Sequence, residues 1–369
     1  MTSCSPPAPP ESSVPAPSFP SAPKPFCAPS WTTRVSPSRP RLTAAQYADG
    51  ILAGHRVTLA RAITLIESEL PADADLAADV LDRILPHTGN SRRIGISGVP
   101  GAGKSTFIDT LGMHLIRDRG ERIAVLSVDP SSPYSGGSIL GDKTRMERLA
   151  VDDNAFIRPS PARGHLGGVA RRTRPAMLLC EAAGFGNVIV ETVGVGQSET
   201  AVRSMTDFFL LLTLAGAGDE LQGIKRGILE MVDCVAVNKA DGENKPNAMR
   251  ARAELADALH LFPAATTGWV PPVVVCSALA GDGVSQIWDI ALSHHMHLEA
   301  GGHLAAQRRQ QSLAWMHELI AIGLEDSFQH HPAVKQRFPE LEQRVRDGQT
   351  SSFAAARELL LLFLGGQQP

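Results

Sequence analysis

Short apolar runs alternate with longer amphipathic segments through the middle of the chain. The runs predict six buried strands, at residues 94–97, 123–128, 188–191, 208–214, 234–238 and 273–277. Because segments with helical spacing separate them, we expect right-handed β-α-β units and a mostly parallel sheet with helices on both faces. The pattern predicts an α/β domain over residues 91–298.

Helical spacing dominates on both sides of this domain. Apolar residues recur at about every third or fourth position between Thr43 and Pro71 and again over 76–85, which predicts an N-terminal helical segment at 41–90. Two more stripes follow residue 303, one over 353–364 and one made of Leu313, Met316, Leu319, Ile320 and Leu324. Each stripe needs a covering surface, either this domain or a second copy of the chain. We expect a helical arm at 299–369.

Composition narrows the class of protein. The first 40 residues hold 12 of the 27 prolines, which predicts a disordered leader over 1–40. A transit peptide is the alternative, but so many prolines disfavour the amphipathic helix that such peptides form. Five cysteines without a CxxC pair suit a reducing compartment. We expect a cytoplasmic protein, or one of the mitochondrial matrix if the source is eukaryotic.

Charge and hydropathy disfavour two classes of partner. The formal net charge is −3 and charged residues make up 20% of the chain, so no overall field attracts a nucleic acid or an anionic membrane surface. No apolar stretch approaches the roughly 18 residues that a membrane-spanning helix needs. We expect neither a nucleic-acid partner nor a membrane partner.

The most specific motif follows the first predicted strand and opens a helix. Residues 98–106 read GVPGAGKST and satisfy GxxxxGK[ST], the phosphate-binding P-loop. The glycines let backbone N–H groups surround a phosphate, Lys104 reaches the β and γ oxygens, and Ser105 offers its hydroxyl to Mg²⁺. The expected nucleotide-binding residues here are Gly98, Pro100, Gly101, Ala102, Gly103, Lys104, Ser105 and Thr106.

The identity of the base is predicted by a turn after the fifth predicted strand. Residues 238–241 read NKAD, and Asp241 can accept hydrogen bonds from both N1–H and the N2 amine of guanine, a donor pair that adenine lacks. The tip of the last strand, at 277–279, stands where a backbone N–H of GTPases supports guanine O6. The sequence thus predicts GTP and GDP as ligands. The expected base-binding residues are Asn238, Lys239, Asp241, Ser277, Ala278 and Leu279.

Acidic residues after two strands are candidates for a magnesium site. An ion bound by Ser105 and by phosphate oxygens needs carboxylates nearby, often through water, so Asp129, Asp142 and Glu191 are the candidates. Asp142 alternatively suits the N-cap of its own helix. Gly194 follows the strand that carries Glu191, and its backbone N–H can approach the γ-phosphate because no side chain intervenes.

Together these motifs resemble the MeaB/ArgK family of GTPases, the bacterial counterparts of the methylmalonic aciduria type A protein. The matching stretches, in order, are GVPGAGKST (98–106), VDPSSPYSGGSILGDKTRM (128–146), ETVGVGQSE (191–199), AGAGDELQGIKRGILE (215–230) and NKAD (238–241). The likeness runs from residue 59 to about residue 295 and more loosely through the C-terminal helices.

The resemblance implies a GTP hydrolase with a P-loop fold of the SIMIBI class, flanked by helical segments, whose C-terminal arm forms a homodimer. It implies an adenosylcobalamin-dependent acyl-CoA mutase as partner, first of all methylmalonyl-CoA mutase, whose cofactor the GTPase, as a chaperone, helps to load and protect. It places Asp129 and Glu191 in the magnesium site. It makes Asp142 a switch aspartate and Lys225 a mobile lysine that approaches the nucleotide when the partner is bound. The expected catalytic residues are Lys104, Asp142, Glu191 and Lys225.

Two alternative functions stay open. A nickel-insertion GTPase would need His or Cys ligands near the nucleotide. The dense histidine cluster lies elsewhere in the sequence, and we interpret it as a solvated helix end; it consists of His294, His295 and His297. A nucleotide-bound scaffold without turnover is the second alternative.

Two further features have no assigned role. Gln197 either orients the attacking water or lies at the surface. A basic run is either a solvated helix face or a docking patch for an acidic partner, and it consists of Arg163, Arg171, Arg172 and Arg174.

Overall fold

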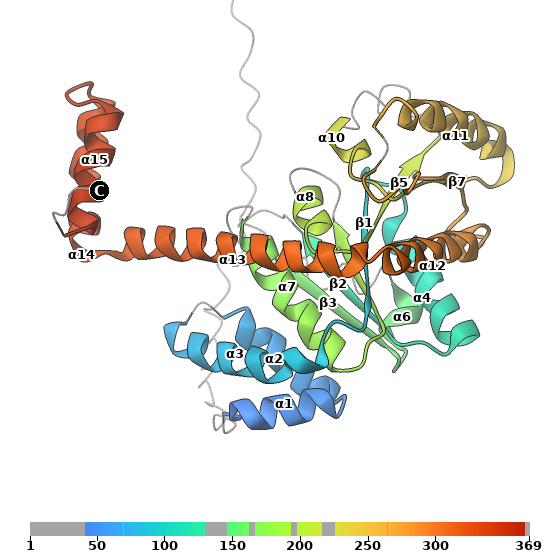
Figure 1. The fold of residues 1–369 in the computed structure, drawn as a ribbon, viewed down its shortest axis with the longest axis horizontal. Coiled ribbons are helices and arrows are strands. Elements are labelled where there is room, and N and C mark those ends of the chain that lie inside the picture. The colour runs from blue at the N-terminus through green and yellow to red at the C-terminus, as the bar shows by residue number, and fades with distance from the viewer. Residues whose placement is uncertain are drawn as a thin grey trace, which may run out of the picture. The chain divides into compact units, whose positions relative to one another are not determined.

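A parallel sheet forms the centre of the protein (Figure 1). The computed structural model describes residues 41–68, 70–129, 146–161, 167–192, 198–215, 226–263 and 265–365, so the predicted leader lies outside the described residues. Within them the sheet has seven strands in the order β3-β2-β4-β1-β5-β6-β7, each pair parallel. The strands are β1 (Arg92–Gly98), β2 (Ile123–Asp129), β3 (Ala155–Pro161), β4 (Asn187–Thr192), β5 (Phe208–Leu214), β6 (Cys234–Asn238) and β7 (Val273–Val275).

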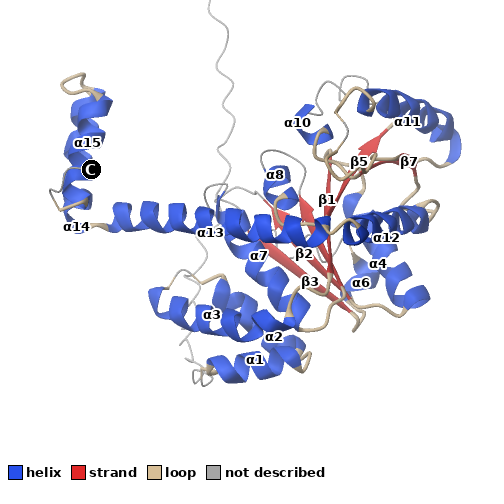
Figure 2. Ribbon diagram, viewed as in Figure 1, coloured by secondary structure: helices blue, strands red, loops and turns tan. Residues whose placement is uncertain are grey.

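Helices cover both faces of the sheet (Figure 2). One face packs against α4 (Lys104–Arg119), α6 (Glu147–Ala150) and α12 (Val284–Ala300). The other face packs against α7 (Gly167–Ala182), α8 (Ser198–Arg203), α10 (Arg226–Leu229) and α11 (Lys245–Leu259). The N-terminal helices α1 (Ala44–Leu52), α2 (Arg56–Ile66) and α3 (Pro71–Ile84) pack against one another and against α7. Short 3₁₀ turns follow α3 and precede α11, at Leu85–His87 and Gly242–Asn244.

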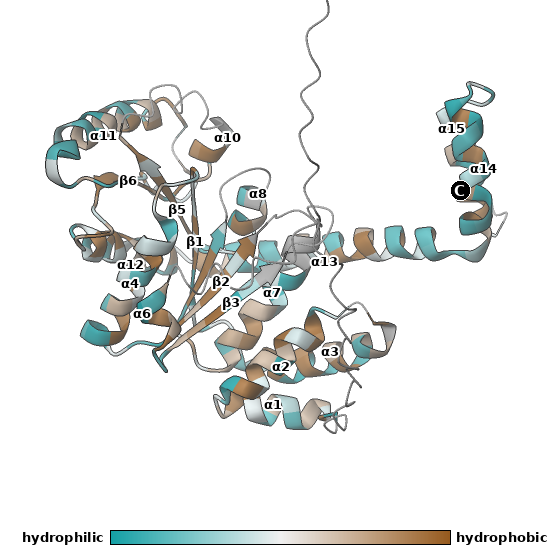
Figure 3. Ribbon diagram, turned by 180° about the vertical axis from the view of Figure 1, so that it is seen from behind, coloured by the Kyte–Doolittle hydropathy of each residue, from teal (hydrophilic) through white to brown (hydrophobic). Residues whose placement is uncertain are grey.

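Both sides of the central strands are buried, which explains their continuous apolar runs. In β5, Phe209 and Leu211 belong to the core under α7, whereas Phe208 and Leu210 belong to the core under α4. Successive side chains of a strand point to opposite faces, so a sheet covered on both faces needs apolar residues at every position. Figure 3 shows these strands predominantly in the brown of apolar residues. The predicted α/β class with a parallel sheet is confirmed.

The predicted helical stretch between Thr43 and Pro71 is two helices. The turn between α1 and α2 contains Gly54 at φ 73°, a left-handed conformation that glycine adopts without steric cost. Thr43 caps α1, since its hydroxyl accepts a hydrogen bond from the Gln46 N–H at 3.2 Å. From Leu42 onward the chain forms one compact unit, so its division at residues 90 and 298 stays a prediction.

Strand β3 is absent from the sequence prediction. It lies at the edge of the sheet, where it pairs with β2. Its apolar residues are only Ala155, Phe156 and Ile157, after which Arg158 and two prolines follow. Proline is tolerated at an edge because one side of such a strand donates no ladder hydrogen bonds. The strand therefore lacks the long apolar run that identifies the buried strands.

The C-terminal region is helical, as predicted. It consists of α13 (His303–His330), α14 (Pro332–Arg346) and α15 (Ser352–Phe363). The last two helices share a small core of Val334, Leu341, Ala355 and Leu359. Among the described helices, none has both the length and the apolar character to cross a membrane.

Arg308 attaches the start of α13 to the sheet. Its guanidinium donates to both carboxylate oxygens of Asp207, at 2.9 and 2.6 Å, and to the Ser91 carbonyl at 2.6 Å. Asp207 also accepts the N–H of Arg93 at 3.0 Å. Because this charged pair is largely buried and forms several hydrogen bonds, it fixes the helix where β1 and β5 begin.

Arg174 makes a second attachment, and both interpretations of the basic run are wrong for this residue. It is buried, and it donates to the Ser204 carbonyl at 2.6 Å and to the Gln311 carbonyl of α13 at 2.5 Å. Its guanidinium also lies over the Trp315 ring, 5.6 Å from the centroid. Burial, with the nearby positive charge of Arg93, lowers the pKa of Arg174 to about 10. Arg174 is thus neither a solvated residue nor a docking residue, whereas Arg163 lies outside the described residues.

Candidate functional site

The P-loop joins the end of β1 to the start of α4, at the carboxyl edge of the sheet where ligands of parallel α/β folds bind. Gly98 passes so close to β5 that an added Cβ would lie 2.1 Å from the Leu212 carbonyl oxygen. Gly103, at φ 86°, leaves room for Asn238, whose Nδ2 would lie 2.7 Å from such a Cβ. Glycine is therefore required at both ends of the loop by close packing and, at Gly103, by its left-handed backbone.

Lys104 points back across the P-loop. Its side chain is buried, and its ammonium donates to the Gly98 carbonyl at 2.8 Å and to the Val99 carbonyl at 3.2 Å. The positive charge thus lies against the backbone that the motif uses to surround a phosphate, beside the N-terminus of α4. This position agrees with the predicted role of Lys104 at phosphate oxygens.

Two predicted metal ligands from different elements meet next to this lysine. The Ser105 hydroxyl donates to Glu191 Oε1 at 3.1 Å, and the Ser127 hydroxyl donates to Oε2 at 3.4 Å. Glu191 is buried near the end of β4, where it is paired in register with Ser127 of β2. A hydroxyl and a carboxylate are hard oxygen donors, the kind of ligand that Mg²⁺ prefers. Because the two groups lie within hydrogen-bonding distance of each other, they fit a single Mg²⁺ site.

The other predicted phosphate and metal residues are only partly described. Asp129 ends β2, the neighbour of the strand that carries Glu191, so its backbone lies at the same edge of the sheet. Asp142, Gly194, Gln197 and Lys225 lie outside the described residues. Their predicted roles stay predictions.

Asn238 connects the base-recognition turn to the P-loop. Its Nδ2 donates to the Ala102 carbonyl at 2.7 Å, and its Oδ1 accepts the N–H of Ala278 at 2.9 Å. One buried side chain therefore holds the P-loop, the end of β6 and the loop after β7 together. This contact explains why asparagine, with one donor and one acceptor group, suits the first position of the motif.

Asp241 has one carboxylate oxygen bound within the protein. The Ser277 hydroxyl donates to its Oδ2, which leaves the carboxylate in a fixed orientation. Lys239, between Asn238 and Asp241, adopts φ 59°, which is unusual for a residue with a side chain. Its carbonyl accepts a hydrogen bond from Asn244 Nδ2 at 2.8 Å. Beside this turn the side chain of Leu279 is 86% exposed. The structure thus brings the predicted base residues together around Asn238 and Asp241.

Sequence reasoning missed several residues that support the site. Ser127 contacts Glu191, as described above, and the Thr192 hydroxyl donates to Ser97 Oγ at 2.9 Å. On α4, Asp109 and Thr110 contact residues of other elements. None of these residues belongs to the quoted motifs, apart from Thr192, and their partners are distant in sequence, so no local pattern identifies them.

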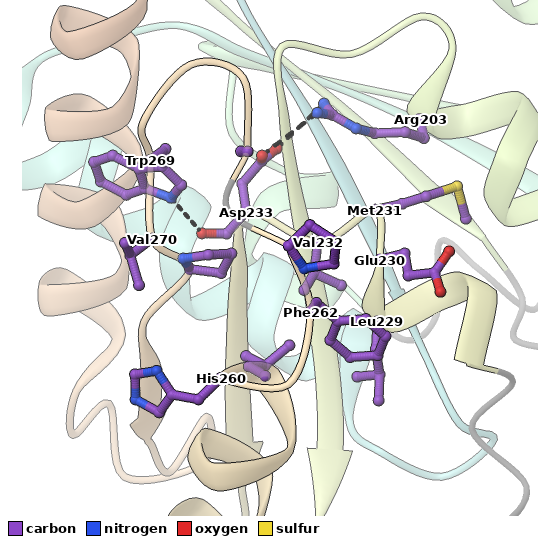
Figure 4. A pocket seen from close by; sticks show the side chains of 14 residues that line it. Arg203, Leu229, Glu230, Met231, Val232, Asp233, His260, Phe262, Trp269 and Val270 are labelled. Carbon is purple, nitrogen blue, oxygen red and sulfur yellow. Dashed lines mark hydrogen bonds and ion pairs between the residues drawn. The ribbon is translucent and has the colours of Figure 1, made fainter.

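A separate cavity of about 340 Å³ lies at the opposite end of β6, next to Asp233 (Figure 4). Asp233 pairs with Arg203 at 3.2 Å, and its carbonyl accepts the indole N–H of Trp269 at 2.9 Å. Since β6 runs from this cavity to Asn238, the length of the strand separates the cavity from the nucleotide site.

The interpretation of the histidine cluster as a solvated helix end is wrong for His294. This residue is 2% exposed, and its Nε2 lies 3.4 Å from Asp233 Oδ1. Its ring contacts Trp269 edge-on with centroids 4.9 Å apart. The interior face of α12 explains the burial, because His294 lies one turn after Ala291 in the core. Among the described residues, no group of three His, Cys, Asp or Glu side chains could hold a metal ion.

Comparisons with known proteins agree with this site. The family described as methylmalonyl Co-A mutase-associated GTPase MeaB matches residues 59–333. A putative GTPase of Caulobacter vibrioides is 52% identical over 313 residues, covering 85% of this chain and 95% of the relative. The methylmalonic aciduria type A homolog, mitochondrial, of Mus musculus is 45% identical over 324 residues, covering 85% of this chain and 78% of the relative.

A solved structure extends the agreement to the fold. The crystal structure of a protein described as LAO/AO transport system kinase has a TM-score of 0.68 and 38% sequence identity, and the match covers 87% of this chain and 97% of that one. The family match includes the P-loop, Glu191 and the 238–241 turn. The resemblance found in the sequence is confirmed: the chain belongs to the MeaB family and is a GTPase.

Proposed function

We propose that the protein binds GTP with Mg²⁺ between the P-loop and the 238–241 turn and hydrolyses it to GDP and phosphate. The contact between Ser105 and Glu191 carries this proposal, since it joins oxygen donors from α4 and β4 beside the ammonium of Lys104. The backbone of Gly98, Pro100, Gly101, Ala102, Gly103 and Thr106 surrounds the phosphates.

Each group at the phosphate end has a distinct task. Lys104 binds β and γ oxygens, where negative charge grows during hydrolysis, and Gly194 supports the γ-phosphate through its N–H. Ser105 and Glu191 hold the metal, with Asp129 and Asp142 as further ligands or water-mediated partners. When bound, Mg²⁺ would supply positive charge that offsets the negative charge of the phosphates. Ser127 keeps the Glu191 carboxylate oriented for this task.

We propose that the partner is an adenosylcobalamin-dependent acyl-CoA mutase, and that methylmalonyl-CoA mutase is the first candidate. In this proposal the GTPase acts as a chaperone that helps to load and protect the cofactor of the mutase. The description of the family and the name of the mouse relative support this choice. In this proposal the mutase brings Asp142 and Lys225 to the nucleotide and thereby speeds hydrolysis. We place the complex in the cytoplasm.

The Lys225→Ala variant tests the partner. Adding methylmalonyl-CoA mutase should accelerate GTP hydrolysis by the natural protein, whereas the acceleration should fall towards one-fold in the variant, because a positive charge near the phosphates is lost. Phosphate release with and without the mutase measures the ratio, and Lys245→Ala, at an exposed lysine of α11, is the control. Undiminished acceleration would show that Lys225 is a surface residue. No acceleration of the natural protein would remove this mutase as partner.

We also propose that the protein is a homodimer formed through α13. Five apolar residues on one stripe of this helix are 41–58% exposed, namely Leu313, Met316, Leu319, Ile320 and Leu324. Spacings of three, four and seven residues place them along one face, and a second copy of the same stripe would remove that apolar area from water.

A charge on this stripe tests the dimer. Ile320→Glu should convert the dimer to a monomer, because association would bury an unpaired carboxylate. Light scattering after size exclusion measures the mass. Gln329→Glu is the matched control: its residue is nine positions further on and so lies on the opposite side of the helix. An unchanged mass in the Ile320 variant would place the interface elsewhere.

The two alternative functions have less support. A nickel-insertion GTPase needs His or Cys ligands, and in the described part of the chain no suitable group of ligands occurs. A scaffold without turnover does not agree with membership of a GTPase family.

A further inference from the structure

Thr110 connects the phosphate-binding helix to the base-recognition loop. It lies on α4, which begins with Lys104 and Ser105, and its hydroxyl donates to the Ala278 carbonyl at 2.8 Å. These two residues are 168 positions apart in the chain. The contact therefore belongs to the tertiary structure, and it joins the helix that follows the P-loop to the loop expected to meet the base.

Arg148 directs the Thr110 hydroxyl towards this carbonyl. Its guanidinium donates to Thr110 Oγ1 at 2.8 Å, so the oxygen acts as an acceptor there and its proton is available for Ala278. Asp109 in turn accepts Arg148 Nε at 2.6 Å and the Leu149 N–H at 3.0 Å. The largely buried Asp109 carboxylate thus holds Arg148 in place with charge-assisted hydrogen bonds.

Ala278 is fixed on both sides by side chains from outside its own loop. Its N–H donates to Asn238 Oδ1 at 2.9 Å, and its carbonyl accepts from Thr110. The two peptide groups that flank this residue are planar, so fixing one atom in each also fixes the direction of the backbone through 277–279. A polar contact from this loop to the base depends on that direction.

We propose that Thr110, oriented by Arg148 and Asp109, is a positioning residue for guanine recognition at O6. It touches neither the nucleotide nor the metal; it sets the position of the loop that meets the base. The inference rests on the proposed function, GTP binding, and on the contact that the sequence predicts between guanine O6 and the backbone of Ser277, Ala278 and Leu279.

The analogue 6-thio-GTP tests the positioning role. Its sulfur is a weaker hydrogen-bond acceptor than O6, so the natural protein should bind GTP more tightly than the analogue. Thr110→Val keeps the shape but removes the hydroxyl, and it should weaken GTP binding about fivefold while leaving 6-thio-GTP binding much less affected. The preference for GTP should shrink accordingly, and KM for GTP should rise more than kcat falls. Thr110→Ser keeps the hydroxyl and should restore the preference.

Arg148→Ala provides a second test at a residue whose side chain is half exposed. It should reduce the preference for GTP less than Thr110→Val does, because the threonine can still donate without guidance. If Thr110→Val fails to fold, as judged by thermal unfolding, this variant decides the question. A preference equal to that of the natural protein in the folded variants would overturn the inference. A natural protein that does not distinguish the two nucleotides would instead overturn the proposed O6 contact.

Discussion

Replacement of Lys104 by alanine should reduce GTP hydrolysis by about 10³-fold or more and should weaken GTP binding. The ammonium lies over the P-loop, where it binds Gly98 and Val99 carbonyls, and it is positioned for the oxygens on which charge develops during hydrolysis. Removing one preorganised donor of this kind typically costs about 10²–10³ in rate, and a full positive charge adds to that. Single-turnover phosphate release at saturating GTP measures the effect.

Two controls separate this charge from effects on the fold. Lys245→Ala removes an exposed lysine of α11 and should leave the rate unchanged. Lys104→Arg keeps the charge but changes its geometry, so it should recover little activity. Thermal unfolding of all three variants verifies that they are folded. A Lys104→Ala protein that hydrolyses GTP at close to the natural rate would contradict the role of the P-loop lysine.

The features predicted from sequence are those whose cause is local. The P-loop needs glycine at Gly103 because the backbone there is left-handed, and Lys104 and Ser105 follow it directly in the chain. The buried strands need apolar residues on both faces, which leaves an apolar run in the sequence. Such requirements are contiguous in the chain, so they predicted both the fold class and the core of the site.

The features that were missed depend on partners distant in sequence. His294 resembles any polar residue near a helix end until Asp233 and Trp269 are placed beside it. Arg174 resembles a surface arginine until the carbonyls of Ser204 and Gln311 are placed around it. A buried polar side chain is stabilised by hydrogen bonds whose partners no periodicity reveals. For the same reason the sequence did not predict the contact of Thr110, which lies close to the P-loop motif but donates to Ala278, 168 positions away.

Replacement of Asp241 by asparagine should change the preferred nucleotide from GTP to XTP. Asp241 has one oxygen bound by Ser277, so its carboxylate is oriented before the base arrives. An asparagine of the same shape presents an amide donor where guanine also presents donors, whereas xanthine has a carbonyl at that position.

The loss of affinity for GTP should be large and the gain for XTP should accompany it. Two hydrogen bonds to a charged acceptor contribute roughly 1.5–3 kcal/mol each, so GTP binding should weaken at least 10²-fold. Competition of GTP and XTP for a fluorescent nucleotide measures both affinities, and XTP should restore hydrolysis because Lys104, Ser105 and Glu191 are unchanged. The control is Asn244→Ala, which removes the contact to the Lys239 carbonyl but leaves the carboxylate of Asp241, and it should keep the preference for GTP. If the Asp241 variant still bound GTP more tightly than XTP, guanine would be recognised by other groups of the chain.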